Sequence, residues 1–188
     1  MFKKDLRIKY KALRHQISRE VVEDQSMGIA NRLLSMDIWE HTYFHLFLSI
    51  EEQKEVDTEF ILQILAGRDK EVVVSKSHFD TIKMTHYLLT DNTKFQKSEY
   101  NIYEPVDGIE VPTSKIDVVF VPLLGYDVQG NRVGYGKGFY DAFLSQCKKD
   151  VVKIGLSFFE PEQEITDVLN TDIRLDYCVT PTTVYSFR

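Results

Sequence analysis

The chain has 188 residues, of which 43% are hydrophobic and 28% are charged, as is typical of a single soluble globular domain. Its net charge of −6 argues against a general nucleic-acid-binding surface, and its longest apolar run, VVFVPLL at residues 118–124, is too short to cross a membrane. We therefore expect one domain over residues 1–188 that binds neither nucleic acid nor membrane. Cys147 and Cys178 form no CxxC pair, which favours a reducing cytoplasm.

The N-terminal segment concentrates positive charge. Residues 1–19 contain seven Lys or Arg and a single acid, Asp5. The segment has no apolar core of the kind found in secretory signals, so we expect it to belong to the fold and to meet an anionic partner. Apolar residues recur in it at helical spacing and predict a helix over 3–17, with the stripe Leu6, Tyr10, Leu13 and Ile17.

The next elements are predicted from caps and apolar patterns. Ser18 is placed to cap a second helix over residues 21–36, and Thr58 or Asp57 to cap a third over 59–66, which Gly67 ends. Strands are predicted at 43–50, 71–77, 83–89, 116–124, 151–158 and 175–181, with a last helix at 140–149.

Alternating strands and helices predict the fold class. The pattern indicates a single three-layer α/β/α domain with a mostly parallel sheet, similar to a Rossmann fold. His45 lies in an apolar strand, where we expect a core histidine with satisfied hydrogen bonds.

The segment NRVGYGKGFYD, residues 131–141, lies between the most apolar strand and the last helix. Glycines at 134, 136 and 138 leave backbone N–H groups accessible beyond the carboxyl end of a strand, where α/β sheets bind ligands. Arg132 and Lys137 add positive charge at a helix start, which already favours anions. The segment therefore predicts a phosphate cradle; the alternative is a glycine-rich turn that only redirects the chain.

The longer segment GYDVQGNRVGYGKGFYD, residues 125–141, resembles the signature of the 5-formyltetrahydrofolate cyclo-ligase family. Further segments resemble the family in chain order: KKDLR at 3–7, FLSIEEQKEVDTEFI at 47–61, NIYEP at 101–105 and TDIRLDYCVT at 171–180. The resemblance implies an ATP- and Mg²⁺-dependent enzyme, which we expect to be a monomer. It would convert 5-formyltetrahydrofolate to 5,10-methenyltetrahydrofolate by phosphorylating the formyl oxygen, and would release ADP and phosphate.

By this resemblance, ATP contacts the first helix and the glycine loop: Lys3, Lys4, Asp5, Leu6, Arg7, Arg132, Val133, Gly134, Tyr135, Gly136, Lys137, Gly138, Phe139 and Tyr140. Arg132 and Lys137 are the expected catalytic residues, because phosphoryl transfer needs alignment and charge neutralisation rather than a protein nucleophile. The resemblance does not extend to Lys9, Lys11 or Arg14, for which we expect a solvated face.

Glu55 resembles the carboxylate with which the family binds folate; the alternative is an exposed glutamate before a helix. Glu55 lies six positions after Ser49, where four are usual, so either Leu48 or Ile50 could supply the apolar folate contact. The expected folate contacts are Glu55, Ile50, Leu48, Arg7, Tyr135 and Phe139.

Asp141 and Asp172 resemble the family's magnesium ligands. Mg²⁺ needs few protein carboxylates when waters and phosphates complete its shell. Alternatively, Asp141 complements the dipole of its own helix and Asp172 caps a turn.

Two other functions stay open. A folate- or nucleotide-binding protein without turnover could use the same scaffold, but its loop would be eroded, whereas here the loop is intact. An ATP-independent sugar-phosphate isomerase of a related fold would also need a phosphate cradle. It would not explain the basic N-terminal helix.

Overall fold

The computed structural model describes all 188 residues. Its helices are α1 (Lys3–Gln16), α2 (Arg19–Leu33), α3 (Glu59–Gly67) and α4 (Phe139–Gln146), with 3₁₀ turns η1 (Glu51–Gln53) and η2 (Thr113–Lys115). The central strands are β1 (Tyr43–His45), β2 (Glu71–His78), β3 (Lys83–Leu88), β6 (Val118–Pro122), β9 (Val152–Leu156), β10 (Tyr177–Val179) and β11 (Val184–Ser186). Two short pairs complete the fold: β4 (Phe95–Lys97) with β5 (Tyr103–Pro105), and β7 (Gly125–Tyr126) with β8 (Arg132–Val133).

The central sheet has the strand order β11-β10-β9-β6-β1-β2-β3. The five inner strands run parallel, and the edge strands β3 and β11 pair antiparallel with β2 and β10. The predicted α/β fold with a mostly parallel sheet is confirmed, and the antiparallel edges are additional features.

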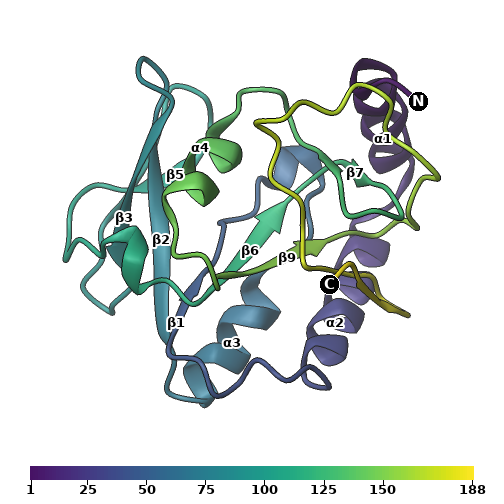
Figure 1. The fold of residues 1–188 in the computed structure, drawn as a ribbon. Helices are drawn as coiled ribbons and strands as arrows, with labels where there is room; N and C mark the ends of the chain where they lie inside the picture. The colour runs from purple at the N-terminus through teal and green to yellow at the C-terminus, as the bar shows by residue number, and fades with distance from the viewer.

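The two faces of the sheet follow the alternation of side chains along β6. Val118 and Phe120 belong to the core under α2 and α3, while Val119 and Val121 belong to the core under α4. Figure 1 shows α2 and α3 below the sheet and α4 above it, which gives the three predicted layers.

Helix α1 packs over the β7–β8 hairpin through a small third core. Leu6 and Tyr10 are buried there with Leu124 and Val133. A Cβ added to Gly125 would come within 2.6 Å of the Tyr10 ring, so the helix lies directly on the hairpin backbone. The basic N-terminal segment is therefore a packed helix.

Several predicted boundaries need correction. The first strand ends at His45 rather than at residue 50, because the chain leaves the ladder toward η1. The predicted helices 21–36 and 140–149 end earlier, at Leu33 and Gln146. The hairpin before the glycine loop was not predicted.

The structure shows which of the predicted capping residues form hydrogen bonds at the helix starts. The Ser18 hydroxyl accepts a hydrogen bond from the Val21 N–H (3.2 Å), as predicted. At α3, Asp57 Oδ1 accepts from the Glu59 N–H (3.0 Å), while the Thr58 hydroxyl donates to the Phe47 carbonyl instead. Both cysteines are free, and no helix combines the length and apolar character needed to span a membrane.

Candidate functional site

The glycine loop and α1 lie against one another. Gly136 (φ 95°) and Gly138 (φ 78°) adopt left-handed conformations that favour glycine, and α4 begins directly after Gly138. The Arg7 guanidinium Nε donates to the Gly134 carbonyl (2.9 Å), and a Cβ on Gly136 would lie 3.2 Å from Arg7 Cζ. The fold thus brings together the two segments predicted to contact ATP.

The two predicted metal ligands each pair with a predicted ATP-binding cation. Lys3 forms an ion pair with Asp172, and Arg132 Nη2 donates to Asp141 Oδ1 (2.9 Å). The N–H of Ile173, the residue after Asp172, also donates to Asp141 Oδ1 (2.9 Å). Asp141 and Asp172 therefore converge from distant parts of the chain, and each already has a cationic neighbour.

This pair suits a metal that arrives with a nucleotide better than a permanent metal centre. No group of three or more His, Cys, Asp or Glu residues is arranged so that it could hold a metal ion. Mg²⁺ commonly uses one or two carboxylates together with waters and substrate phosphates. The alternative roles are met as well, since Asp141 lies in the first turn of α4 and Asp172 accepts the Leu169 N–H (2.7 Å).

Lys137 and Arg132, the two expected catalytic residues, have contrasting surroundings. Lys137 is exposed at the tip of the loop and has no ion-pair partner. The Arg132 side chain is only 7% exposed; besides pairing with Asp141, it donates to the Ile173 carbonyl. Lys137 is thus available to a ligand, whereas Arg132 is held by protein groups.

Glu55 is buried, so it is not the exposed glutamate of the alternative interpretation. Its Oε1 accepts a hydrogen bond from the Tyr135 hydroxyl (2.8 Å), and its Oε2 accepts one from the Ile50 N–H (2.8 Å). Burial raises the pKa of Glu55, while the Ile50 N–H, the nearby Arg14 charge and the Tyr135 hydroxyl act in the opposite direction. The glycine loop and the predicted folate-binding carboxylate are therefore in direct contact.

The long spacing between Ser49 and Glu55 is accommodated by η1. Lys54 follows this turn in a left-handed conformation (φ 46°), and its ammonium donates to the His15 carbonyl at the end of α1 (2.9 Å). The chain folds back, so that Glu55 reaches the Ile50 N–H. Ile50 and Leu48 are both half-buried, and the backbone bond places Ile50 beside the carboxylate.

Arg14 was predicted to be solvated, and this prediction is wrong. It is 6% exposed, its Nη1 donates to the Tyr135 hydroxyl (3.0 Å), and its Nη2 donates to the Leu123 carbonyl (2.5 Å). The available signal was spacing, because Leu6, Tyr10 and Arg14 follow one another at intervals of four and share the buried face of α1. Lys11 is exposed, as predicted.

The aromatic residues of the glycine loop diverge. The Phe139 ring lies 5.1 Å from the Phe79 ring, and the Tyr140 ring lies 6.0 Å from the His45 ring. Only Tyr135 contacts Glu55 through its hydroxyl. The three side chains therefore reach different neighbours, and Tyr140 packs toward the sheet.

A hollow of about 550 Å³ has Phe79 in its wall. The Phe79 ring contacts the ring of Phe139, the first residue of α4, so the hollow lies beside the start of this helix. Its lining was not predicted, although the segment NIYEP contains the buried Glu104, which accepts the Ser77 N–H (3.0 Å). The hollow is lined by Ser77, His78, Phe79, Asp80, Ser98, Glu99, Tyr100 and Glu104.

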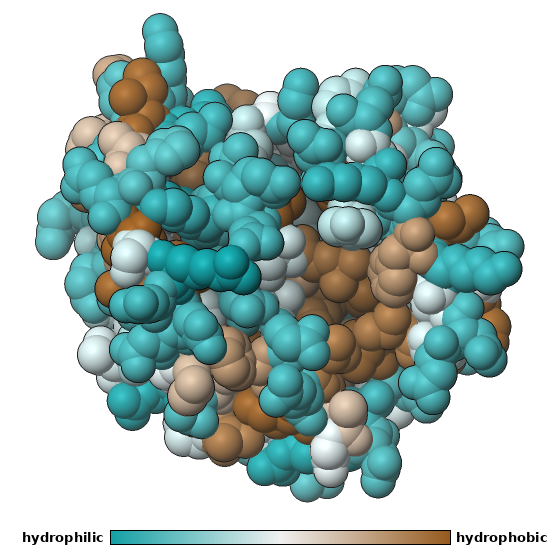
Figure 2. Space-filling view, turned by 180° about the vertical axis from the view of Figure 1, so that it is seen from behind, coloured by the Kyte–Doolittle hydropathy of each residue, from teal (hydrophilic) through white to brown (hydrophobic).

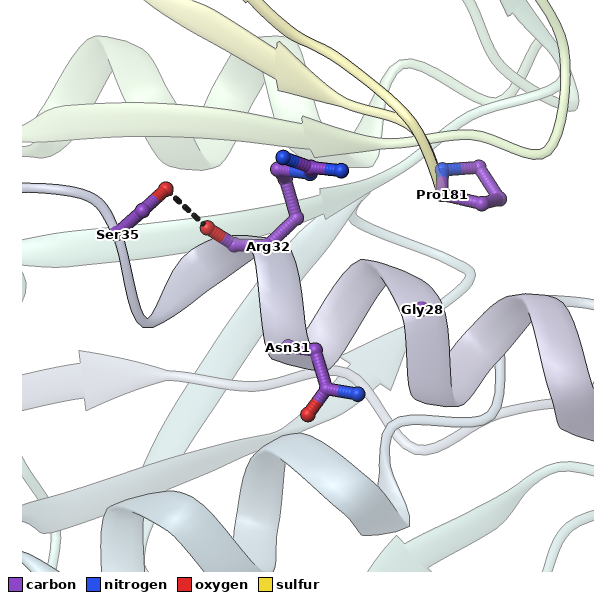
Figure 3. Close-up of a pocket in the computed structure, with 5 residues that line it drawn as sticks. All are labelled: Gly28, Asn31, Arg32, Ser35 and Pro181. Carbon is purple, nitrogen blue, oxygen red and sulfur yellow. Dashed lines mark hydrogen bonds between the residues drawn. The ribbon is translucent and has the colours of Figure 1, made fainter.

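Two other features lie on the surface. Figure 2 shows apolar side chains gathered in a recess with hydrophilic side chains around it. A separate hollow of about 400 Å³ lies between α2 and Pro181, where Arg32 and Asn31 point in different directions (Figure 3). This second hollow contains neither the glycine loop nor Glu55, so we do not assign it to the site.

Comparison with known proteins identifies the family. A sequence model described as the 5-formyltetrahydrofolate cyclo-ligase family matches residues 1–181. The chain belongs to this family. It is 29% identical to the mouse 5-formyltetrahydrofolate cyclo-ligase over 153 residues, which cover 77% of this chain and 74% of the mouse protein. It is 26% identical to the Escherichia coli K12 cyclo-ligase, over 93% of this chain and 97% of that protein.

The fold of this cyclo-ligase family member agrees with solved structures. The Aquifex aeolicus 5,10-methenyltetrahydrofolate synthetase matches with a TM-score of 0.84 and 28% identity, over 100% of this chain and 94% of that one. The Mycoplasma pneumoniae enzyme of the same name shares the fold, with a TM-score of 0.75 and 22% identity, over 96% of this chain and 99% of that one. The predicted function, cyclisation of 5-formyltetrahydrofolate by a ligase, is confirmed at the level of the family. Neither alternative function is favoured.

Proposed function

We propose that this cyclo-ligase uses ATP and Mg²⁺ to convert 5-formyltetrahydrofolate to 5,10-methenyltetrahydrofolate, with ATP bound between α1 and the glycine loop and folate bound beside Glu55. One observation carries the proposal: Tyr135, in the glycine loop, donates a hydrogen bond to the buried Glu55. A nucleotide on the loop and a folate on the carboxylate would therefore be neighbours, as a transfer between them requires.

The chemistry divides into two balanced steps. The formyl oxygen attacks the γ-phosphorus, the bond from that phosphorus to the ADP oxygen breaks, and an imidoyl phosphate and ADP form. The N10 nitrogen then attacks the activated carbon, the carbon–oxygen bond breaks, and phosphate leaves while N10 loses its proton. No protein nucleophile is needed, because the protein aligns the two substrates and neutralises the phosphoryl charge.

The chain offers distinct groups for the phosphates. Backbone N–H groups at the start of α4 favour an anion, and the exposed Lys137 can approach the transferred group. Lys3 and Arg132 are positive groups next to the same loop, at Asp172 and Asp141. When bound, Mg²⁺ would be held by these two aspartates and would neutralise phosphate charge.

The ion pairs imply that nucleotide and metal bind cooperatively. Phosphate oxygens would compete with Asp172 for Lys3 and with Asp141 for Arg132. The aspartates released in this way would then be available to Mg²⁺. Each ligand therefore favours the binding of the other, and either one alone must displace an existing ion pair.

The test combines turnover with binding. Absorbance of the methenyl product should rise only when 5-formyltetrahydrofolate, ATP and Mg²⁺ are mixed with the protein, and EDTA should abolish the rise until Mg²⁺ is restored. Calorimetric titration with ATP should give a tighter Kd with Mg²⁺ than without it. Full turnover in metal-free buffer, or an ATP affinity independent of Mg²⁺, would contradict the metal assignment.

A further inference from the structure

We propose that Arg14 is a positioning residue that fixes the Tyr135 phenol and the Glu55 carboxylate in one arrangement and so links the nucleotide loop to the folate site. The inference rests on the proposed role of Glu55 in folate binding. It concerns a side chain that the sequence did not place among the ATP or folate contacts, and that reaches the glycine loop only through the Tyr135 hydroxyl.

The hydrogen bonds run through the three residues in one direction. Arg14 Nη1 donates to the Tyr135 hydroxyl (3.0 Å), and this hydroxyl donates to Glu55 Oε1 (2.8 Å). A phenol that accepts from an arginine and donates to a carboxylate has its hydroxyl hydrogen directed at the carboxylate. The arginine therefore sets the orientation of the Tyr135 hydroxyl, and this hydroxyl holds one oxygen of Glu55.

Burial makes this arrangement energetically demanding. Arg14 is 6% exposed and Glu55 is 5% exposed, and Arg14 Nε has no hydrogen-bond partner. Isolated buried charges are strongly unfavourable, so each charge here depends on the other across one phenol. The Leu123 carbonyl, which accepts from Arg14 Nη2 (2.5 Å), anchors the guanidinium to the end of β6.

The groups that face Glu55 come from three elements. Arg14 comes from α1, Tyr135 and Tyr140 come from the glycine loop and the first turn of α4, and the Ile50 N–H comes from the segment before η1. Of these, only Arg14 is a cation. Burial raises the pKa of Glu55 and the Arg14 charge opposes that rise, so the arginine favours the ionised carboxylate.

A direction in pH follows. The donor edge of a pterin needs an ionised acceptor, so folate affinity should fall as pH drops through the pKa of Glu55. Removing the Arg14 charge raises that pKa further, so the loss should begin at a higher pH. Raising the pH should then restore the affinity, which would not happen if the substitution had only disrupted packing.

The experiment is calorimetric titration of Arg14→Met with 5-formyltetrahydrofolate between pH 6 and pH 8.5, without ATP. We expect affinity to drop about tenfold or more at the acid end and to recover toward wild type at the alkaline end. Arg14→Lys, which keeps the charge but not the two-pronged geometry, should follow the wild-type pH profile with a smaller loss. Arg32→Met removes the same charge from an exposed position on α2 (Figure 3) and should bind folate like wild type.

The outcomes separate this inference from the assignment of Glu55. If Glu55→Gln binds folate normally, the proposed role of Glu55 fails and this inference fails with it. If Glu55→Gln weakens binding but Arg14→Met does not, only the role of Arg14 is overturned. An equal loss at every pH in both Arg14→Met and Arg14→Lys would show a packing role and would also overturn the inference.

Discussion

The face of the central sheet under α2 and α3 differs from the face under α4 in what it buries. The first is covered by apolar side chains, among them Phe44 and Phe120, whose rings stack at 6.2 Å. The second also buries a polar chain, in which Ser75 Oγ lies 2.7 Å from His45 Nε2 and 2.6 Å from His86 Nδ1.

This difference assigns different tasks to the two faces. The rings of His45 and His86 pack on Phe143 of α4, the helix that begins at the glycine loop. His45 is buried, as predicted, and its Nε2 has a hydrogen-bond partner in Ser75. Its Nδ1 has no hydrogen-bond partner, so the expectation that both ring nitrogens are satisfied is wrong for Nδ1. The serine–histidine chain is thus buried on the side of α4, the helix that begins at the glycine loop, while the large core on the opposite face is apolar.

The largest expected effect tests the apolar face. Phe44→Ala should lower the free energy of unfolding by about 3–5 kcal/mol, because it removes a fully buried ring and leaves a cavity. Urea denaturation measures the loss, and KM for both substrates should stay unchanged in the folded fraction. Phe95→Ala, at an exposed position of β4, is the matched control. A Phe44→Ala variant with normal stability but a raised KM would contradict the claim that the face under α2 and α3 contributes to stability and not to substrate binding.

The next effect tests the loop on the α4 side. Lys137→Ala should lower kcat by about a hundredfold or more with little change in stability, because the exposed ammonium is expected to neutralise charge that develops during transfer. Arg132→Ala should act mainly on KM for ATP and should also destabilise the loop, since it breaks the ion pair between the buried Arg132 side chain and the half-buried Asp141. Steady-state kinetics with circular dichroism distinguish the two. Normal turnover by Lys137→Ala would contradict the catalytic role of Lys137 and would show that it is only a solvated charge on the loop.

The effect that is smallest near neutral pH tests the buried histidines. Burial lowers the pKa of His86 to about 4, below the value near 6.5 expected in the unfolded chain. The unfolded state therefore binds more protons in this window, and stability should fall as pH drops from 6.5 toward 4, by about 1.4 kcal/mol per pH unit for one histidine. His86→Gln should flatten this slope in urea titrations, because it removes the buried imidazole whose pKa is lowered. An unchanged slope would show that His86 does not titrate as proposed.

The sequence by itself determined the features that depend on neighbouring residues. The apolar residues of 116–124 predicted the strand β6, and the structure buries Val118 and Phe120 on one face and Val119 and Val121 on the other, because side chains alternate along a strand. Glycine spacing and the helix start predicted the loop before α4, and segment order predicted the family. These signals are local, so they can be read without knowing how the chain returns on itself.

Tertiary structure decided which distant groups meet. The burial of Arg14 and its contact with Tyr135 join positions 121 residues apart, and the Tyr135–Glu55 bond joins positions 80 apart. Asp141 and Asp172 converge only because the segment before β10 returns to the start of α4. A charged side chain is normally expected in water; it becomes buried only when packing brings it its own acceptors and counter-charge, and no local pattern encodes that meeting.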